Sequence, residues 1–129
     1  MIRSVISMSS SFYSDSILAA LDRTGNFRAK NLPPGGRERL AGLCREFDAD
    51  LVILGISWVQ GFRLEERRDA IVDIRDTLPG CKIVLYVDEA ANPDQLEGIK
   101  SLRFARLIDA FVYASCTMEY LIDTLESVI

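Results

Sequence analysis

The feature that most constrains the fold is a regular alternation of short apolar runs with longer segments of helical periodicity. Five short runs are bounded by polar or turn-forming residues, which is typical of strands, and the continuous apolar runs indicate strands buried on both faces. They cover residues 2–6, 27–32, 51–56, 82–87 and 109–113. The run at 27–32 is the weakest of the five, so we expect it near an edge of the sheet.

The segments that separate these strands carry apolar residues at spacings of three and four, as amphipathic helices do. The predicted helices cover residues 14–21, 40–47, 64–78, 92–107 and 118–129. Asn92-Pro93-Asp94 has the pattern of a helix start, and Thr117 is placed to cap the last helix. Thr24-Gly25-Asn26 predicts a turn, and Pro33-Pro34-Gly35-Gly36 predicts a break in the chain.

Strands that alternate with helices in this way favour an α/β fold, in which helices cover both faces of a parallel sheet. Because crossovers between parallel strands are right-handed, we expect a doubly wound sheet with strand order 2-1-3-4-5. The length of 129 residues fits one domain over 1–129. In such sheets the working crevice lies at the carboxyl ends of the strands, near strands 1 and 3.

The composition excludes several kinds of chemistry. The chain has no His, so it can form neither a Ser-His-Asp triad nor a His-ligated metal site. Its 15 Lys and Arg against 19 Asp and Glu argue against broad nucleic-acid binding, which needs clustered cations. Cys44, Cys81 and Cys116 form no CxxC pair, which favours buried thiols in a reducing cytoplasm. No apolar run reaches the roughly 20 residues that cross a bilayer.

Three segments resemble strands of a known signalling domain. Residues 50–54, 79–85 and 109–113 are similar to strands 3, 4 and 5 of the receiver domain of two-component response regulators. The order, lengths and turns of the other segments agree, so the resemblance covers nearly the whole chain. It implies a flavodoxin-like fold and a role in signal transduction or in the regulation of transcription.

The resemblance also assigns positions to the receiver phosphorylation site, and the expected residues are missing there. Gly55 stands where a receiver has its phosphorylatable Asp, and Met8 and Ser9 stand where it has the acidic pair that holds Mg²⁺. Val87 takes the place of the hydroxyl residue that closes strand 4, and Ala114 that of the Lys after strand 5. Phe111 keeps the aromatic switch position of strand 5.

These substitutions remove the chemistry of phosphorylation. Gly55 has no side chain to act as a nucleophile, and Met8 and Ser9 bring no negative charge for a hard cation. We therefore expect a degenerate pseudo-receiver that is not an enzyme and that holds no metal or cofactor. Asp88 and Glu89 follow strand 82–87 and are interpreted as solvated loop carboxylates, and a residual enzyme that used them is the weakest alternative.

A second hypothesis is a small-molecule or anion sensor at the carboxyl edge of the sheet. Hydroxyl side chains and backbone N–H groups near a helix start can hold an anion, and Gly55 would widen the crevice. Helix capping and turn formation explain the same hydroxyl residues more simply. The candidate ligand contacts are Ser9, Ser10, Ser57 and Ser115.

If the crevice binds nothing, the surface carries the function. Lys100, Arg103 and Arg106 form a basic strip on the fourth helix, and the fifth helix carries an acidic strip, Glu119, Asp123 and Glu126. The resemblance implies a common dimer surface on the face formed by the fourth helix, the fifth strand and the fifth helix. A basic strip beside an acidic strip suits such a contact, since each strip would face its opposite across a two-fold axis. The alternative is a solvated face with pairs formed within the chain.

Two features of the segment 57–75 complete the interpretation. Trp58 is either a contact residue for a partner or a plug over the vacant phosphorylation site. The next helix interleaves arginines with carboxylates, which is typical of a solvated helix face; these arginines are Arg63, Arg67, Arg68 and Arg75. We expect a protein partner or a second copy as the binding partner, no membrane contact, and nucleic-acid contact only through an output domain outside this sequence.

Overall fold

The sheet has five parallel strands in the order β2-β1-β3-β4-β5, which confirms the predicted topology. The structure is a computed structural model that describes residues 1–89 and 93–129. The strands are β1 (Ile2–Ser7), β2 (Phe27–Leu32), β3 (Leu51–Ile56), β4 (Lys82–Val87) and β5 (Ala110–Tyr113). The weak strand β2 lies at one edge, as expected, and β3, whose six residues are all buried, lies at the centre.

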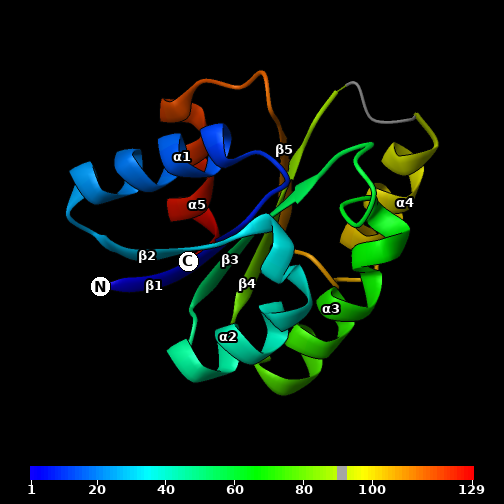
Figure 1. Ribbon diagram of the computed structural model, residues 1–129, viewed down its shortest axis with the longest axis horizontal. Coiled ribbons are helices and arrows are strands. Elements are labelled where there is room, and N and C mark those ends of the chain that lie inside the picture. The colour runs from blue at the N-terminus through cyan, green and yellow to red at the C-terminus, as the bar shows by residue number, and fades with distance from the viewer. Residues whose placement is uncertain (90–92) are drawn as a thin grey trace.

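Helices cover both faces of this sheet (Figure 1). They are α1 (Ser11–Thr24), the 3₁₀-helix η1 (Pro34–Arg39), α2 (Leu40–Phe47), α3 (Leu64–Thr77), α4 (Pro93–Phe104) and α5 (Met118–Val128). Successive side chains of a strand point to opposite faces, so the core divides into two clusters. Ile17 of α1 and Leu121 of α5 pack on one face, and Leu40, Ile71 and Ile99 of α2, α3 and α4 pack on the other.

The first predicted helix and the predicted break differ most from the structure, whereas most other predicted ends lie within one residue of the observed ones. The helix predicted at 14–21 extends over Ser11–Thr24 and ends where Gly25 adopts a left-handed φ of 75°, which glycine allows at little cost. The break predicted at Pro33–Gly36 is instead the start of η1, which leads directly into α2. Pro34 suits this position because its fixed φ fits the first turn of a helix.

Helix α4 ends at Phe104, three residues before the predicted end. Arg106 adopts a left-handed φ of 62°, its N–H bonds the Arg103 carbonyl, and the Leu107 N–H bonds the Leu102 carbonyl. These two bonds form a Schellman motif, so Arg106 lies in the turn after the helix. The predicted start at Asn92 lies outside the described residues.

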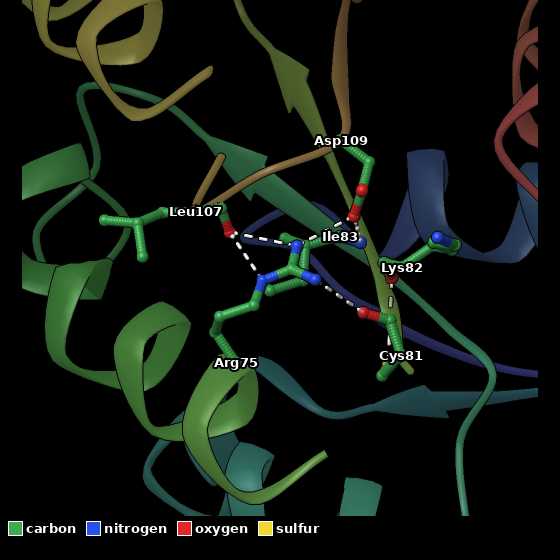
Figure 2. Close-up of polar contacts among 6 residues, drawn as sticks. All are labelled: Arg75, Cys81, Lys82, Ile83, Leu107 and Asp109. Carbon is green, nitrogen blue, oxygen red and sulfur yellow. Dashed lines mark hydrogen bonds and ion pairs between the residues drawn. The ribbon is translucent and has the colours of Figure 1, made fainter. Parts of the chain in front are cut away.

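Arg75 connects α3 to the amino ends of β4 and β5 (Figure 2). Its guanidinium lies 2.8 Å from the Asp109 carboxylate, which also accepts the Ile83 N–H at 2.8 Å. Burial acts to raise the pKa of Asp109, but the bonds from Arg75 and Ile83 outweigh it and hold this pKa below its usual range. Arg75 therefore does not belong to a solvated face, and the prediction for it was wrong.

Within residues 1–89 and 93–129, we find no helix of the length and apolar character needed to cross a membrane.

Candidate functional site

A cavity of about 190 Å³ opens at the carboxyl edge of the sheet, where the topology places the crevice. Its walls come from the ends of β1, β3, β4 and β5 and from the first turn of α1. The lining residues are Met8, Ser9, Ser10, Tyr13, Gly55, Ile56, Ser57, Val59, Tyr86, Asp88 and Ala114. The fold thus brings together Met8, Ser9, Gly55 and Ala114, four of the positions that the resemblance assigns to a phosphorylation site.

Met8 closes the space that the missing side chain at Gly55 would leave. The Met8 side chain is buried, and a Cβ at residue 55 would lie 3.0 Å from its Cγ and 3.2 Å from its Cα. Glycine is therefore the residue that allows this close approach of β1 and β3. The expectation that Gly55 widens the crevice was wrong, because Met8 packs against it.

Tyr86 and Asp88, rather than Val87, face the cavity from the end of β4. Val87 closes β4 as expected, but its side chain packs into the core on the face covered by α2, α3 and α4. The Tyr86 hydroxyl donates to the Ala114 carbonyl at 3.1 Å. Burial, with Cys116, Tyr13 and Glu89 nearby, raises the pKa of Tyr86 to about 12, so it remains a neutral donor at ordinary pH.

Three of the four serines expected to contact a ligand lie together at the cavity, and the fourth does not. Ser9, Ser10 and Ser57 line the cavity, and the Ser9 and Ser57 hydroxyls lie 3.4 Å apart. The Ser115 N–H instead donates to the Glu89 carboxylate at 2.9 Å, and this bond lowers the pKa of Glu89. Ser115 is thus paired with an acid outside the cavity lining, which removes it as an anion contact. Glu89 is exposed, as expected of a loop carboxylate, and it also bonds the backbone of the β5–α5 loop.

Arg67 is the residue of this edge that the sequence interpretation missed. Its side chain, expected on a solvated face, is 3 % exposed. The guanidinium donates to the Ser7 carbonyl at 3.0 Å, to the Gly55 carbonyl at 2.8 Å and to the Ser7 hydroxyl. Its position was readable from the sequence, since it lies three residues after Leu64 and four before Ile71, on the apolar side of α3.

The β3–α3 loop, residues 57–63, is held against this guanidinium. The buried Phe62 ring stacks on Arg67, with the guanidinium carbon 4.9 Å from the ring centroid, and Arg37 of η1 lies 5.8 Å from the same ring. The Gly61 N–H donates to the Glu66 carboxylate at 2.9 Å. Burial and the charge of Arg37 lower the pKa of Arg67 to about 10, which leaves it protonated at neutral pH.

The receiver fold implies a Mg²⁺ ion at this edge, and the donor set does not fit one. Mg²⁺ is held by carboxylates together with water and phosphate oxygens. Of the cavity-lining residues only Asp88 has a carboxylate, and Asp88 already takes part in a contact of its own. Among the described residues, no three His, Cys, Asp or Glu side chains gather in a group that could hold a metal ion.

The predicted basic strip surrounds a hollow of about 480 Å³ beside β5, formed by Lys100, Arg103, Phe104, Arg106 and Phe111. Phe104 projects from α4 and is 92 % exposed. Phe111 is half-buried, and its ring centroid lies 6.0 Å from that of Tyr113.

The acidic strip, Glu119, Asp123 and Glu126, is exposed on α5. The side chains described for residues 1–89 and 95–129 form three ion pairs, and none of these involves the basic or the acidic strip. All six residues of the two strips are exposed, which the alternative of a solvated face also expects, so the dimer surface stays a prediction.

Trp58 does not plug the site. Its side chain is 62 % exposed and lies outside the cavity lining, while its carbonyl accepts a bond from Arg63 Nε at 3.2 Å. Trp58 lies instead beside a groove between α3 and α4 that Arg63, Leu64 and Arg68 also line. The structure thus leaves Trp58 available for contact with a partner.

Comparison with solved structures shows the same fold in response regulators. A LuxR-family DNA-binding response regulator from Staphylococcus aureus superposes with a TM-score of 0.77 at 19 % identity, over 99 % of this chain and 98 % of that one. The chemotaxis protein CheY4 from Vibrio cholerae gives 0.75 at 12 % identity, over 100 % and 99 %. RcsB from Salmonella enterica, bound to a promoter, gives 0.74 at 16 % identity, over 99 % and 68 %.

No family model matches the sequence, and no curated protein is similar to it in sequence. The identities to the solved structures are low, so the likeness rests on backbone geometry that covers the whole chain. The chain therefore has the fold of a response-regulator receiver domain.

Proposed function

We propose that the chain is a signalling domain that works through protein contacts and does not accept a phosphoryl group. The observation that carries this proposal is the carboxyl edge itself, where Gly55 replaces the nucleophile and Met8 packs against it. Phosphoryl transfer to a protein side chain needs a positioned nucleophile and positive charge near the transferred group. The lining has no side chain at residue 55 and no Lys or Arg, so we expect the domain to act without catalysis and without a cofactor.

Intact-mass measurement tests this proposal directly. The protein is incubated with acetyl phosphate and Mg²⁺, beside a phosphorylatable receiver as the positive control. We expect the mass of this chain to remain unchanged while the control gains a phosphoryl group. A stable phosphoryl adduct on this chain would reject the proposal, and the modified peptide would identify the acceptor.

The surface around β5 is the proposed site of contact, either with a second copy or with a protein partner. The basic strip and the acidic strip of the same chain have no ion-pair partners among the described side chains. In a two-fold dimer each strip meets the opposite strip of the other copy, which is the arrangement an isologous interface requires. The exposed Phe104 supplies apolar area at the same place, and aromatic side chains are enriched at interfaces.

Charge reversal tests the dimer. Arg103→Glu with Arg106→Glu should weaken self-association in sedimentation experiments, and adding Glu119→Lys with Asp123→Lys should restore it. Arg28→Glu with Arg39→Glu, on exposed residues of β2 and η1, is the control for the change in net charge. A monomer at all concentrations would remove the dimer and leave a different protein as the partner.

The setting we propose is transcription control in the cytoplasm. Two of the structural neighbours are a DNA-binding response regulator and a regulator bound to its promoter. This chain is acidic, with 15 cations against 19 carboxylates, so contact with DNA would need an output domain outside this sequence.

One observation favours a second candidate function, the sensing of a small apolar molecule. The cavity of about 190 Å³ is open, and two phenol rings, Tyr13 and Tyr86, lie in its wall with centroids 5.9 Å apart. Titration with phenol as a probe should raise the melting temperature, and Ala114→Leu should abolish the rise by filling the cavity. No rise with the unmodified chain would remove this candidate.

A further inference from the structure

The unusual feature of the carboxyl edge is a buried cation that faces only uncharged oxygens. Arg67 is 3 % exposed, and its three hydrogen bonds go to the carbonyls of Ser7 and Gly55 and to the Ser7 hydroxyl. Between the described side chains, no ion pair includes Arg67. Burying a charge without an opposite charge costs free energy, so the presence of a buried arginine at this position needs a structural explanation.

The bonds of Arg67 show what the charge does. Ser7 ends β1 and Gly55 lies one residue before the end of β3, so one guanidinium joins the carboxyl ends of the two central strands to α3. These are the strand ends beside which a receiver would hold its metal ion, and the residues present here do not suit that ion. The guanidinium supplies positive charge from within the chain, where it needs no carboxylate ligands.

The same side chain also fixes the loop that follows β3. Phe62 stacks on the Arg67 guanidinium, the Phe62 N–H bonds the Val59 carbonyl at 2.9 Å, and the Ser57 N–H bonds the Phe62 carbonyl at 3.0 Å. Arg37 of η1 also packs against this loop at Gly61, because a Cβ at residue 61 would lie 2.3 Å from Arg37 Nε. The φ of 90° at Gly61 is one that residues with a side chain rarely adopt, so glycine suits both this backbone conformation and the contact with Arg37.

We propose that Arg67 is an internal cation that holds the β3–α3 loop in one conformation without a divalent ion. The inference rests on the proposed function, because a chain that neither binds metal nor accepts a phosphoryl group needs another way to fix this edge. Arg67 is a positioning residue: it presents the exposed Trp58 on a rigid loop, and a rigid contact residue loses less conformational entropy on binding.

The loop contains the only Trp of the chain, so its mobility can be measured without a label. In Arg67→Met we expect faster depolarisation of Trp58 fluorescence and roughly tenfold faster hydrogen exchange at the Ser57 and Phe62 amides, since Phe62 loses the guanidinium on which it stacks. Arg75→Met is the matched control, because it removes a partly buried arginine of the same helix from the opposite edge. The control should leave the loop amides and Trp58 unchanged.

Added Mg²⁺ provides a test on the unmodified protein. We expect Mg²⁺ to change neither the Trp58 depolarisation nor the loop exchange of the wild type. A slowing by Mg²⁺ would show that a divalent ion still fixes the loop and would overturn the inference. If Arg67→Met does not fold, Arg67→Lys keeps the charge but not the forked geometry and should loosen the loop to a smaller extent.

The outcomes separate this inference from the proposed function. A phosphoryl adduct in the mass experiment together with a loosened loop in Arg67→Met would reject the proposed function and retain the role of Arg67 in fixing the loop. An unmodified mass together with an unchanged loop in Arg67→Met would retain the proposed function and reject the role of Arg67.

Discussion

The two ends of α3 place an arginine at opposite edges of the sheet, and the two arginines are stabilised in different ways. At the amino edge, Arg75 meets the Asp109 carboxylate at 2.8 Å, and both side chains remain about one-fifth to one-quarter exposed. At the carboxyl edge, Arg67 is almost fully buried and bonds only neutral oxygens. The Arg75–Asp109 contact is a conventional ion pair. Burying Arg67 costs desolvation energy that no carboxylate offsets, and its hydrogen bonds join the ends of β1 and β3.

The difference between the two arginines suggests that one edge of the sheet mainly stabilises the fold and that the other edge serves function. The amino edge joins α3, β4 and the segment before β5 through groups that satisfy one another. The carboxyl edge holds the cavity, the buried cation and the exposed Trp58. Strained or costly arrangements persist where the surrounding structure supports them, and they cluster at functional sites. The comparison therefore supports the carboxyl edge as the working end of the molecule.

The largest expected effect is a loss of stability at alkaline pH. It arises mainly from two thiols buried on the face of the sheet that α3, the helix of Arg75, covers. Burial raises the pKa of Cys44 and of Cys81 from 9.0 to about 12. Their contribution is fully present below pH 9 and is lost as the pH rises toward 12, by several kcal/mol for the two thiols together, because the unfolded chain releases its protons first. Urea unfolding across this range should show the fall.

Cysteine variants locate this alkaline effect. Cys44→Ala with Cys81→Ala should flatten the fall in stability, although the loss of packing lowers stability at neutral pH. Cys116→Ala, near the carboxyl edge, should flatten it much less, since burial raises the pKa of Cys116 by a smaller amount. An unchanged slope in the double variant would show that the alkaline sensitivity arises elsewhere.

The second effect compares the arginines themselves at neutral pH. Arg67→Met should lower the free energy of unfolding by about 3 kcal/mol, because two buried carbonyls and a hydroxyl lose their donor. Arg75→Met should lower it by about 1–2 kcal/mol, since Asp109 keeps its bond to the Ile83 N–H and is partly solvated. Chemical denaturation of both variants makes the comparison. An equal or larger loss in Arg75→Met would remove the distinction between the edges.

The backbone arrangement followed from the sequence because each strand and helix has its own local signal. The apolar run Leu51–Ile56 was predicted to be a central strand, and the same bounds are found in β3. Thr117 was expected to cap the last helix, and its hydroxyl accepts the Tyr120 N–H at 3.0 Å. The end of α4 was missed, because the left-handed turn at Arg106 lacks the glycine that usually marks such a turn.

The site was less predictable, since it depends on which side chains meet after folding. The topology placed Met8, Ser9 and Gly55 together correctly, but the packing of Met8 against Gly55 has no sequence signal. Arg67 was grouped with its charged neighbours, although its spacing from Leu64 and Ile71 placed it on the apolar side of α3. Periodicity identifies the position, and only the fold shows which oxygens satisfy a buried charge.

The smallest expected effect is at acid pH, where it should again separate the two edges. Asp109 has an ordinary pKa of 3.8 that Arg75 and the Ile83 N–H lower in the folded chain despite burial. This contribution is present above pH 3.8 and is lost as the pH falls through the lowered value, by roughly 1 kcal/mol or less at this exposure. In Asp109→Asn the free energy of unfolding, measured with urea, should therefore fall less steeply at acid pH than in the wild type.

In Arg67→Met the fall at acid pH should match that of the wild type, because the oxygens that face Arg67 do not titrate. A wild-type fall in Asp109→Asn would assign the acid sensitivity to other carboxylates and would leave the buried cation, rather than the ion pair, as the electrostatic difference between the two edges.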